Sequence, residues 1–183
     1  MEWSALETGP QTLLRAGIQG FICPNYSQSA FLVAKSLIPM LKISATHYDA
    51  IRRHGEEAYP HECCGVLLGR FENDGSRLVT SAEPCRNTRT DSAHNRYSID
   101  PRELVRIQRE GRQRGQDIVG FYHSHPDHPA QWSQTDLAEA HWIGCSYVIT
   151  SVEQGKAAVT NSFALAGSAE ENKKLESEPI QIA

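Results

Sequence analysis

The chain of 183 residues is long enough for one compact domain with an appended segment, and too short for two full domains. With 39% hydrophobic and 22% charged residues it has the composition of a globular protein, which excludes disordered, collagen-like and membrane-spanning classes. The net charge of −4 lacks the basic character of a nucleic-acid-binding protein, so we expect neither a nucleic acid nor a membrane as partner.

Residues 1–39 differ in character from the rest of the chain. Prolines and glycines interrupt this segment, and its most apolar stretch contains Lys35 and Pro39 and is too short to span a bilayer. Glu2 and Glu7 stand where a secretory signal would be positively charged. We therefore expect no cleaved signal and a cytoplasmic protein.

Helices and strands are predicted to alternate after this segment. Thr46 followed by Asp49 resembles a helix cap, and the apolar spacing behind it predicts a helix to about Tyr59. The continuous apolar run Cys64–Leu68 is typical of a central strand covered on both faces. A turn and a second strand over residues 78–82 follow.

The next stretch, residues 85–98, is rich in Asn, Thr, Asp and Ser, which predicts a long loop with a short strand near Tyr97. Asp100, followed directly by a proline, predicts the start of a helix that runs to about Arg114. Residues 86–114 hold eight arginines and four acidic residues. We interpret them as a solvated surface, with a docking surface for an acidic partner as the alternative.

Three further elements complete the prediction. An apolar strand is expected over residues 118–122, a helix from Ser133 to about His141, and a hairpin from strands 147–151 and 157–163. The fold class predicted from this order is α/β, with a mixed sheet and helices packed against it.

Five cysteines form an odd, scattered set without a Cys-x-x-Cys pair. This pattern, without a secretory signal, predicts reduced thiols instead of a disulfide framework. Because Cys63 and Cys64 are consecutive, a strand would direct them to opposite faces. We interpret both as small buried hydrophobic residues, with a thiolate near a metal ion as the alternative.

The stretch from Gly120 to Asp136 contains the most informative residues. His123 and His125 are two positions apart at the end of a predicted strand, so both imidazoles project to the same side. A catalytic zinc ion takes three protein ligands and keeps one position for water. Asp136 completes such a set, because the prolines that follow His125 allow the chain to turn back.

Each of these residues also has a plainer interpretation. A single His-x-His pair is a weak pattern, and Ser133 with Asp136 matches an ordinary helix-capping box. Asp127 and His128 lie in the turn itself and are interpreted as exposed turn residues. The conjunction of the histidine pair with Asp136 favours a metal site.

A hydrolytic zinc site also needs a base that takes a proton from water and hands it to the leaving group. Glu62 directly precedes the predicted buried strand, where a charged side chain is unfavourable without a partner; the alternative is a surface glutamate. Ser133, one helical turn from Asp136, is the candidate hydroxyl for the developing oxyanion.

The residues now named resemble a known motif. Glu62 within His-Glu-Cys-Cys-Gly, then His123-Ser-His125-Pro, then Ser133-x-x-Asp136 after seven intervening residues, resemble the JAMM motif of the MPN-plus metalloproteases. All five functional positions occur in the family's order. The resemblance is greatest to the compact stand-alone prokaryotic members and implies their MPN, cytidine-deaminase-like fold.

The resemblance also divides the chain. It covers roughly residues 40–165 and implies a JAMM/MPN-plus catalytic domain over residues 40–166. Residues 1–39 are then an N-terminal extension of unknown role, and residues 167–183 are a polar, solvated C-terminal tail.

By resemblance, His123, His125 and Asp136 bind Zn²⁺, Glu62 is the general acid/base, and Ser133 stabilises the oxyanion. The implied enzyme is a zinc metallohydrolase, a metallopeptidase or isopeptidase that cleaves a peptide, isopeptide or related bond. Family members act at the C-terminal tail of ubiquitin or ubiquitin-like proteins, and small bacterial members act on sulfur-carrier proteins.

The loop over residues 85–98 is implied to lie beside the cleft and to hold the substrate tail by strand addition. Arg86, Asn87, Arg89 and Trp132 are therefore the candidate substrate contacts.

Two other functions stay open at this point. One is a catalytically silent MPN scaffold or interaction module, and the other is a zinc hydrolase of a small peptide or amide. The sequence does not specify the substrate, the bond cleaved, or the oligomeric state.

Overall fold

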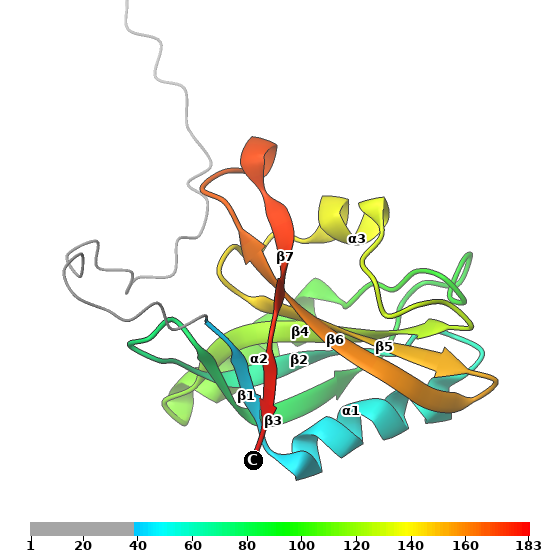
Figure 1. Ribbon diagram of the computed structural model, residues 1–183, viewed down its shortest axis with the longest axis horizontal. Helices are drawn as coiled ribbons and strands as arrows, with labels where there is room; N and C mark the ends of the chain where they lie inside the picture. Colours follow the sequence, from blue (N-terminus) through cyan, green and yellow to red (C-terminus); the bar gives the residue numbers. More distant parts are fainter. Residues whose placement is uncertain (1–38) are drawn as a thin grey trace, which may run out of the picture. The chain divides into compact units, whose positions relative to one another are not determined.

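A computed structural model describes residues 39–183 (Figure 1). The N-terminal extension expected before residue 40 and its Cys23 lie outside the described residues, apart from Pro39 itself. Within the described part of the chain, no helix combines the length and apolar character needed to cross a membrane.

The fold is built on one mixed sheet with the strand order β7-β6-β5-β4-β2-β3-β1-β8. The strands are β1 (Leu41–Ile43), β2 (Cys64–Phe71), β3 (Arg77–Cys85), β4 (Asp117–Pro126), β5 (Ser146–Glu153), β6 (Lys156–Ala166), β7 (Lys174–Glu178) and β8 (Ile180–Ile182). The helices are α1 (Ala45–Ala58), α2 (Pro101–Gln113), α3 (Gln134–Glu139) and the short 3-10 helix η1 (Glu170–Asn172). The predicted α/β class with a mixed sheet is confirmed.

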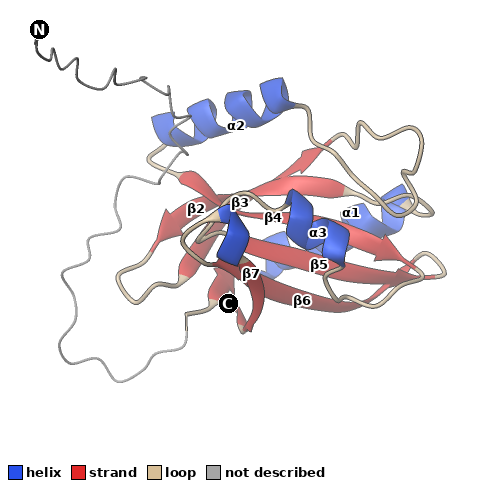
Figure 2. Cartoon of the chain, turned by 90° about the horizontal axis from the view of Figure 1, so that it is seen from above, coloured by secondary structure: helices blue, strands red, loops and turns tan. Residues whose placement is uncertain are grey.

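Helices cover the two faces of this sheet, and each face has its own hydrophobic core (Figure 2). Along β2, Cys64 and Leu68 enter the core beneath α2, whereas Leu67 enters the core beneath α1. Cys63 belongs to the α1 core, so the two consecutive cysteines face opposite sides as predicted. The continuous apolar run therefore reflects a strand that is buried on both faces.

The N-terminal caps of α1 and α2 can be compared with the caps that the sequence predicts. Asp100 caps α2, and its side chain accepts a hydrogen bond from the backbone of Arg102. The cap expected at Thr46 is wrong, because α1 begins two residues earlier and its cap is Ser44, whose hydroxyl accepts from the backbone of His47. Both Ser and Thr suit this position, so residue type alone does not choose between them.

The segment after Gly167 differs from the solvated tail that the sequence predicts. It supplies β7, which pairs with β6, and β8, which pairs with β1. The short strand expected near Tyr97 is absent, and that residue lies in the loop between β3 and α2. The tail therefore supplies the two strands at the ends of the strand order.

The two tail strands lie at opposite ends of the strand order, although only Pro179 separates them in the chain. The chain therefore bends at this proline and covers both edges of the sheet. Glu178, the last residue of β7, is buried and forms an ion pair of 3.0 Å with Arg77 of β3. Its other carboxylate oxygen accepts a hydrogen bond of 2.6 Å from Ser162 of β6. Through these contacts Glu178 links β3 to β6, two strands that are not neighbours in the sheet.

Candidate metal centre

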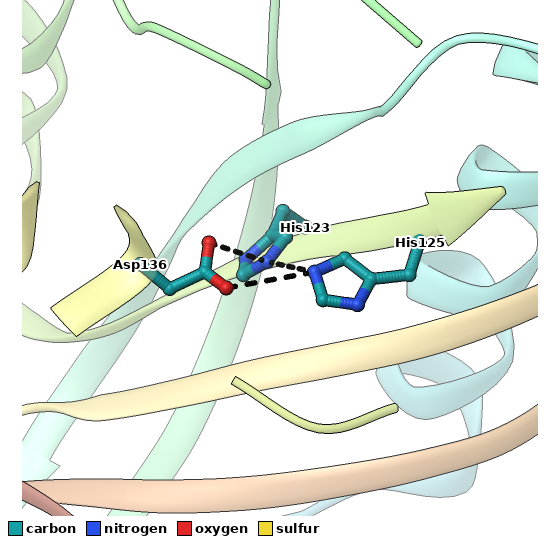
Figure 3. A group of neighbouring side chains, drawn as sticks. All are labelled: His123, His125 and Asp136. Carbon is teal, nitrogen blue, oxygen red and sulfur yellow. Dashed lines mark hydrogen bonds and ion pairs between the residues drawn. The ribbon is translucent and has the colours of Figure 1, made fainter. Parts of the chain in front are cut away.

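The carboxyl end of β4 places two imidazoles on the α2 face of the sheet. His123 and His125 project to the same side, and their Nε2 atoms lie 3.0 Å apart (Figure 3). The His123 side chain is only 2% exposed and the His125 side chain 11%. The period of two along a strand accounts for this convergence.

The third member of the group, Asp136, comes from the first turn of α3. Its carboxylate oxygens lie 3.4 Å from Nε2 of His123 and 3.7 Å from Nε2 of His125. Burial opposes its ionisation, but hydrogen bonding and charge from His123 and Ser133 outweigh burial and hold the pKa of Asp136 below its ordinary value. The group therefore contains an ionised carboxylate at neutral pH.

The capping box predicted at this helix is also present. The Ser133 hydroxyl accepts a hydrogen bond of 3.1 Å from the backbone of Asp136, and the Asp136 carboxylate accepts one of 2.6 Å from the backbone of Ser133. The capping and metal-binding interpretations are compatible, because the cap orients the carboxylate toward the two histidines (Figure 3).

This donor set fits a zinc ion. Donor atoms of a tetrahedral zinc site are separated by about 3.3 to 3.5 Å when each bond is about 2.0 to 2.2 Å long. The three separations of 3.0, 3.4 and 3.7 Å lie around that value. Nδ1 of His125 lies 2.8 Å from the carbonyl oxygen of Pro129. Because a carbonyl only accepts, Nδ1 carries the proton, which leaves the lone pair of Nε2 for a metal ion.

Glu62 lies next to this group at the entry to β2. Its side chain is buried, at 5% exposure, and its backbone amide donates a hydrogen bond of 2.7 Å to the carbonyl of Ala93. Burial raises its pKa to about 7; His123 opposes this shift, whereas Asp136 and Glu139 add to it. A carboxylate that titrates near neutral pH is suited to exchange protons with a substrate.

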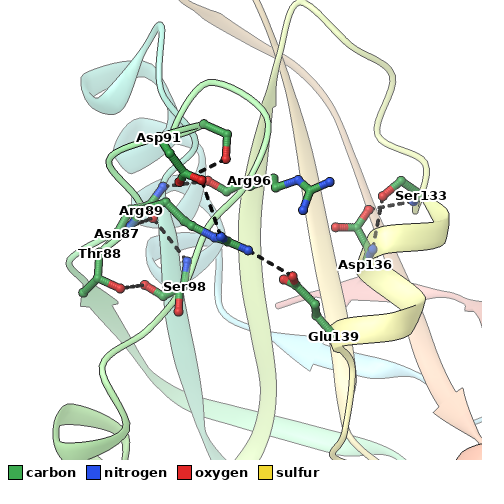
Figure 4. A network of polar contacts seen from close by, with 10 residues as sticks. Asn87, Thr88, Arg89, Asp91, Arg96, Ser98, Ser133, Asp136 and Glu139 are labelled. Atoms are coloured by element: carbon green, nitrogen blue, oxygen red, sulfur yellow. Dashed lines mark hydrogen bonds and ion pairs between the residues drawn. The ribbon is translucent and has the colours of Figure 1, made fainter.

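The loop between β3 and α2 is held beside Glu62 by a single amide side chain. Asn87 donates to the carbonyls of Glu62 (3.1 Å) and Arg96 (3.0 Å). Its Oδ1 accepts from the backbone of Arg89 (3.0 Å) and of Ser98 (3.2 Å) (Figure 4). All hydrogen-bonding groups of the Asn87 amide are thus engaged within the chain. Asn87 was expected to contact the substrate, but in the structure it holds the loop in position.

The other expected substrate contacts occupy different positions. Arg89 reaches across to α3, where its guanidinium lies 3.3 Å from the Glu139 carboxylate (Figure 4). Arg86 is exposed at the start of the loop. Trp132 is half-buried and packs against the core on the α2 face. Arg86 and Trp132 therefore offer free surface, whereas Arg89 joins two walls of the site.

Two residues near the centre were missed from the sequence. The Tyr97 ring stacks on the His123 ring at a centroid distance of 4.7 Å and an interplanar angle of 28°. Glu139, one turn after Asp136, raises the pKa of Glu62 and binds Arg89. The only sequence signal for Tyr97 is its position as the sole tyrosine in a polar loop.

The sequence is similar to several named proteins. Desampylase of Haloferax volcanii is 38% identical over 115 residues, which cover 61% of this chain and 80% of that protein. The probable TtuB-protein conjugate cleaving protease of Thermus thermophilus is 29% identical over 94 residues, covering 51% of this chain and 59% of that protein. These relatives are hydrolases by name.

Two solved structures share the fold. A protein of Desulfitobacterium hafniense superposes with a TM-score of 0.66 at 30% identity, covering 79% of this chain and 93% of that one. A protein of Salinibacter ruber superposes with a TM-score of 0.60 at 37% identity, covering 78% of this chain and 91% of that one. Residues 44–165 match the family model of prokaryotic homologs of the JAB domain. The chain therefore belongs to the family of prokaryotic JAB-domain proteins, as the JAMM-like motif predicts.

Proposed function

We propose that the protein is a zinc-dependent metallopeptidase or isopeptidase. It hydrolyses a peptide, isopeptide or related bond at the C-terminal tail of a ubiquitin-like protein of the sulfur-carrier type. The observation that carries this proposal is the convergence of His123, His125 and Asp136 beside Glu62, a buried carboxyl whose pKa is raised to about 7. The relative named as a TtuB-protein conjugate cleaving protease supports a ubiquitin-like substrate.

His123, His125 and Asp136 would hold the Zn²⁺ ion. When bound, Zn²⁺ supplies Lewis-acid chemistry, which lowers the pKa of water and polarises a carbonyl. Glu62 accepts the proton of the attacking water and delivers it to the leaving nitrogen. Because the Ser133 hydroxyl accepts from the Asp136 backbone, its own proton is available to the carbonyl oxygen of the substrate.

Two segments flank the metal centre and can contact a substrate tail. One is the loop over residues 86–98, and the other is α3 with Trp132 before it. We assign Arg86 and Trp132 to contacts with the tail, while Asn87 and Arg89 hold the loop in place.

The proposal keeps the expected division of the chain. We assign residues 40–166 to the catalytic domain and residues 1–39 to an extension of unknown role. A cytoplasmic location also belongs to the proposal. It is supported by Cys63, Cys64 and Cys85, which are buried thiols, as expected in a reducing compartment.

The test measures bound zinc per chain and hydrolysis of a panel of ubiquitin-like sulfur-carrier fusions. Wild type and Glu62→Gln should both bind one zinc ion, and only wild type should cleave. We expect loss of the base to lower kcat by about 10² to 10⁴-fold. His128→Ala, an exposed histidine in the turn after β4, serves as the matched control.

Other outcomes would contradict the proposal in separate ways. Equal cleavage by Glu62→Gln would remove the assigned base. Zinc binding without cleavage of any fusion would favour the silent scaffold or the small-amide hydrolase. A chain that binds no zinc would exclude the mechanism.

A further inference from the structure

We propose that Tyr97 is a positioning residue for the metal centre. Its ring holds the imidazole of His123 in the orientation that binds zinc, in place of the hydrogen bond that commonly fixes such a ring. The zinc affinity then depends on the loop between β3 and α2, which carries Tyr97. This inference rests on the metal site proposed above and adds a residue outside the ligand set that controls it.

The two candidate histidine ligands differ in how their second ring nitrogen is engaged. Nδ1 of His125 donates to the carbonyl oxygen of Pro129 at 2.8 Å. Nδ1 of His123 is buried and has no hydrogen-bond partner within residues 39–183. A ligand histidine ordinarily donates this second N–H to a carbonyl or a carboxylate, which fixes the orientation of the ring. His123 therefore needs a different contact to hold its ring.

The ring of Tyr97 supplies that contact. The centroids of the Tyr97 and His123 rings lie 4.7 Å apart, and the ring planes are inclined by only 28°. Tyr97 in turn packs against the hydrophobic core on the α2 face, so its own ring is held from behind. A stacked neighbour restricts rotation of the imidazole, which keeps Nε2 of His123 directed at His125 and Asp136 (Figure 3).

The stack favours the metal-bound form of His123. A bound metal ion draws electron density from the imidazole, and an electron-poor ring is attracted to the negative face of a tyrosine ring. Tyr97 itself stays neutral, because burial raises its pKa well above the ordinary value. The contact is therefore stronger when zinc is bound. A difference of this kind between the two states is what allows Tyr97 to raise the zinc affinity.

Asn87 fixes the backbone on both sides of Tyr97. Its Nδ2 donates to the carbonyl of Arg96 at 3.0 Å, and its Oδ1 accepts from the amide of Ser98 at 3.2 Å (Figure 4). The amide of Thr88 also donates to the carbonyl of Ser98, at 2.9 Å. Because Arg96 and Ser98 are the chain neighbours of Tyr97, Asn87 and Tyr97 form one unit that connects the loop to a metal ligand.

This connection works in both directions. If the position of Tyr97 strengthens zinc binding, bound zinc must stabilise the loop by the same free energy. The amide of Ser98, which donates to Asn87, should therefore exchange its hydrogen more slowly with zinc than with a chelator. The difference in exchange should shrink in Tyr97→Leu. An exchange rate that does not respond to zinc in wild type would contradict the connection.

The main experiment measures the zinc Kd of the full-length chain by competition with a chromophoric chelator. Tyr97→Leu should raise the Kd by about 10-fold or more, as is typical when a contact that orients a metal ligand is lost. Tyr97→Phe keeps the ring and should stay within about 3-fold of wild type. Tyr48→Leu, which removes a half-buried tyrosine from the α1 face of the sheet, is the matched control and should leave the Kd unchanged.

A second measurement does not depend on zinc. In the chelator-treated protein, the ring protons of His123 should resonate upfield in wild type and in Tyr97→Phe, because a stacked aromatic ring shields them. In Tyr97→Leu the same protons should move downfield. NMR of histidine-labelled protein measures these shifts. Equal shifts in wild type and Tyr97→Leu would show that the two rings do not stack in solution, which overturns the inference.

Asn87→Ala tests whether the loop acts through Tyr97. This variant leaves the ring in place but frees its backbone, so it should raise the zinc Kd, and it replaces Tyr97→Leu if that variant does not fold. The double variant should bind zinc no more weakly than Tyr97→Leu alone, because both changes remove the same contact. Effects that add in full would overturn the connection through Asn87.

These measurements separate this inference from the proposed hydrolysis. If wild type binds zinc but cleaves no fusion, the hydrolase proposal fails, and a raised Kd in Tyr97→Leu still supports the role of Tyr97. If Tyr97→Leu binds zinc as tightly as wild type, the role of Tyr97 is overturned, whatever the cleavage assay shows. A wild type that binds no zinc would overturn both proposals.

Discussion

The candidate metal centre has two sides that are supported in different ways. His123 and His125 belong to β4, and Glu62 lies two residues before β2. The pairing of Cys64 with His123 places the two strands side by side. Asp136 belongs to α3, which has six residues, none of them buried. The strand side is held by the sheet, whereas the helix side depends on individual side-chain contacts.

Two such contacts are visible at the end of α3. The ammonium of Lys173 donates hydrogen bonds of 2.9 Å to the carbonyls of Ala138 and Ala140. Glu139 accepts from Arg89 of the facing loop at 3.3 Å. The helix that carries Asp136 is therefore held in part by residues that lie far from it in sequence. A variant on the strand side should remove function outright, while variants that loosen the helix side should only reduce it.

The largest effect is expected from the strand side. His123→Ala removes one of three candidate ligands from a rigid wall that cannot supply another. We expect bound zinc to fall well below one per chain and kcat/KM to drop by at least about 10³-fold, as for loss of a metal-assisted step. Atomic absorption and a cleavage assay measure both. A variant that keeps one zinc ion would contradict the assigned ligand set.

The second effect concerns the stability of the metal-free protein. The pKa of Glu62 is about 7 in the folded chain and near 4.5 as a free side chain. Its stabilising contribution is therefore complete below pH 4.5 and is lost as pH rises through 7. Glu62→Gln removes this loss, so its advantage over wild type should grow with pH, to at most about 3 kcal/mol at pH 8.

Urea unfolding with a chelator, at pH 5 and at pH 8, measures this difference. Glu176→Gln, which replaces an exposed carboxylate of β7, is the matched carboxyl-to-amide control. A constant difference for Glu62→Gln would mean that its carboxyl titrates alike in the folded and unfolded chains.

A smaller effect is expected when the helix side is loosened. Lys173→Met removes the ammonium that binds the last carbonyls of α3, and we expect a loss of about 1 to 2 kcal/mol in unfolding free energy. Zinc affinity should fall with it, because Asp136 lies on the same short helix. Lys174→Met, whose ammonium pairs with Glu176 at the surface, should change neither quantity. Unchanged zinc affinity in Lys173→Met would show that the cap alone holds α3.

The smallest effect is expected from a single hydroxyl that connects parts of the strand side. Tyr59 donates a hydrogen bond of 2.8 Å to Asp127, which also accepts one of 2.8 Å from the backbone of Gln154. Tyr59→Phe should lower kcat by a few-fold and stability only slightly, with KM unchanged. Tyr48→Phe, on the same helix α1, is the matched control. A change in KM alone would assign Tyr59 to substrate binding.

The sequence predicts the strand side better than the helix side for a physical reason. The convergence of His123 and His125 follows from the period of a strand, and Asp100 caps α2 as its position before a proline predicts. These are local rules. The contacts of Asn87 and the stacking of Tyr97 link residues through tertiary packing, which no spacing reports.

The two strands at the ends of the strand order, β7 and β8, also depend on tertiary pairing that local sequence patterns do not report. β7 is polar and β8 has only three residues, and both form because β6 and β1 offer them unpaired backbone groups. Residue types in the tail, rich in Glu and Lys, favour a solvated segment, so the propensity of the sequence was overruled by the sheet. The division of the chain at residue 166 stays a prediction.

The bend at Pro179 bears on how the molecule is made. During synthesis, the outer edges of β6 and β1 both stay open until the residues up to Ile182 leave the ribosome. Open edges are templates for pairing with other chains, so the nascent protein is exposed to misassembly until that moment. β7 and β8 then pair with β6 and β1, so one short segment of the chain covers both of these edges.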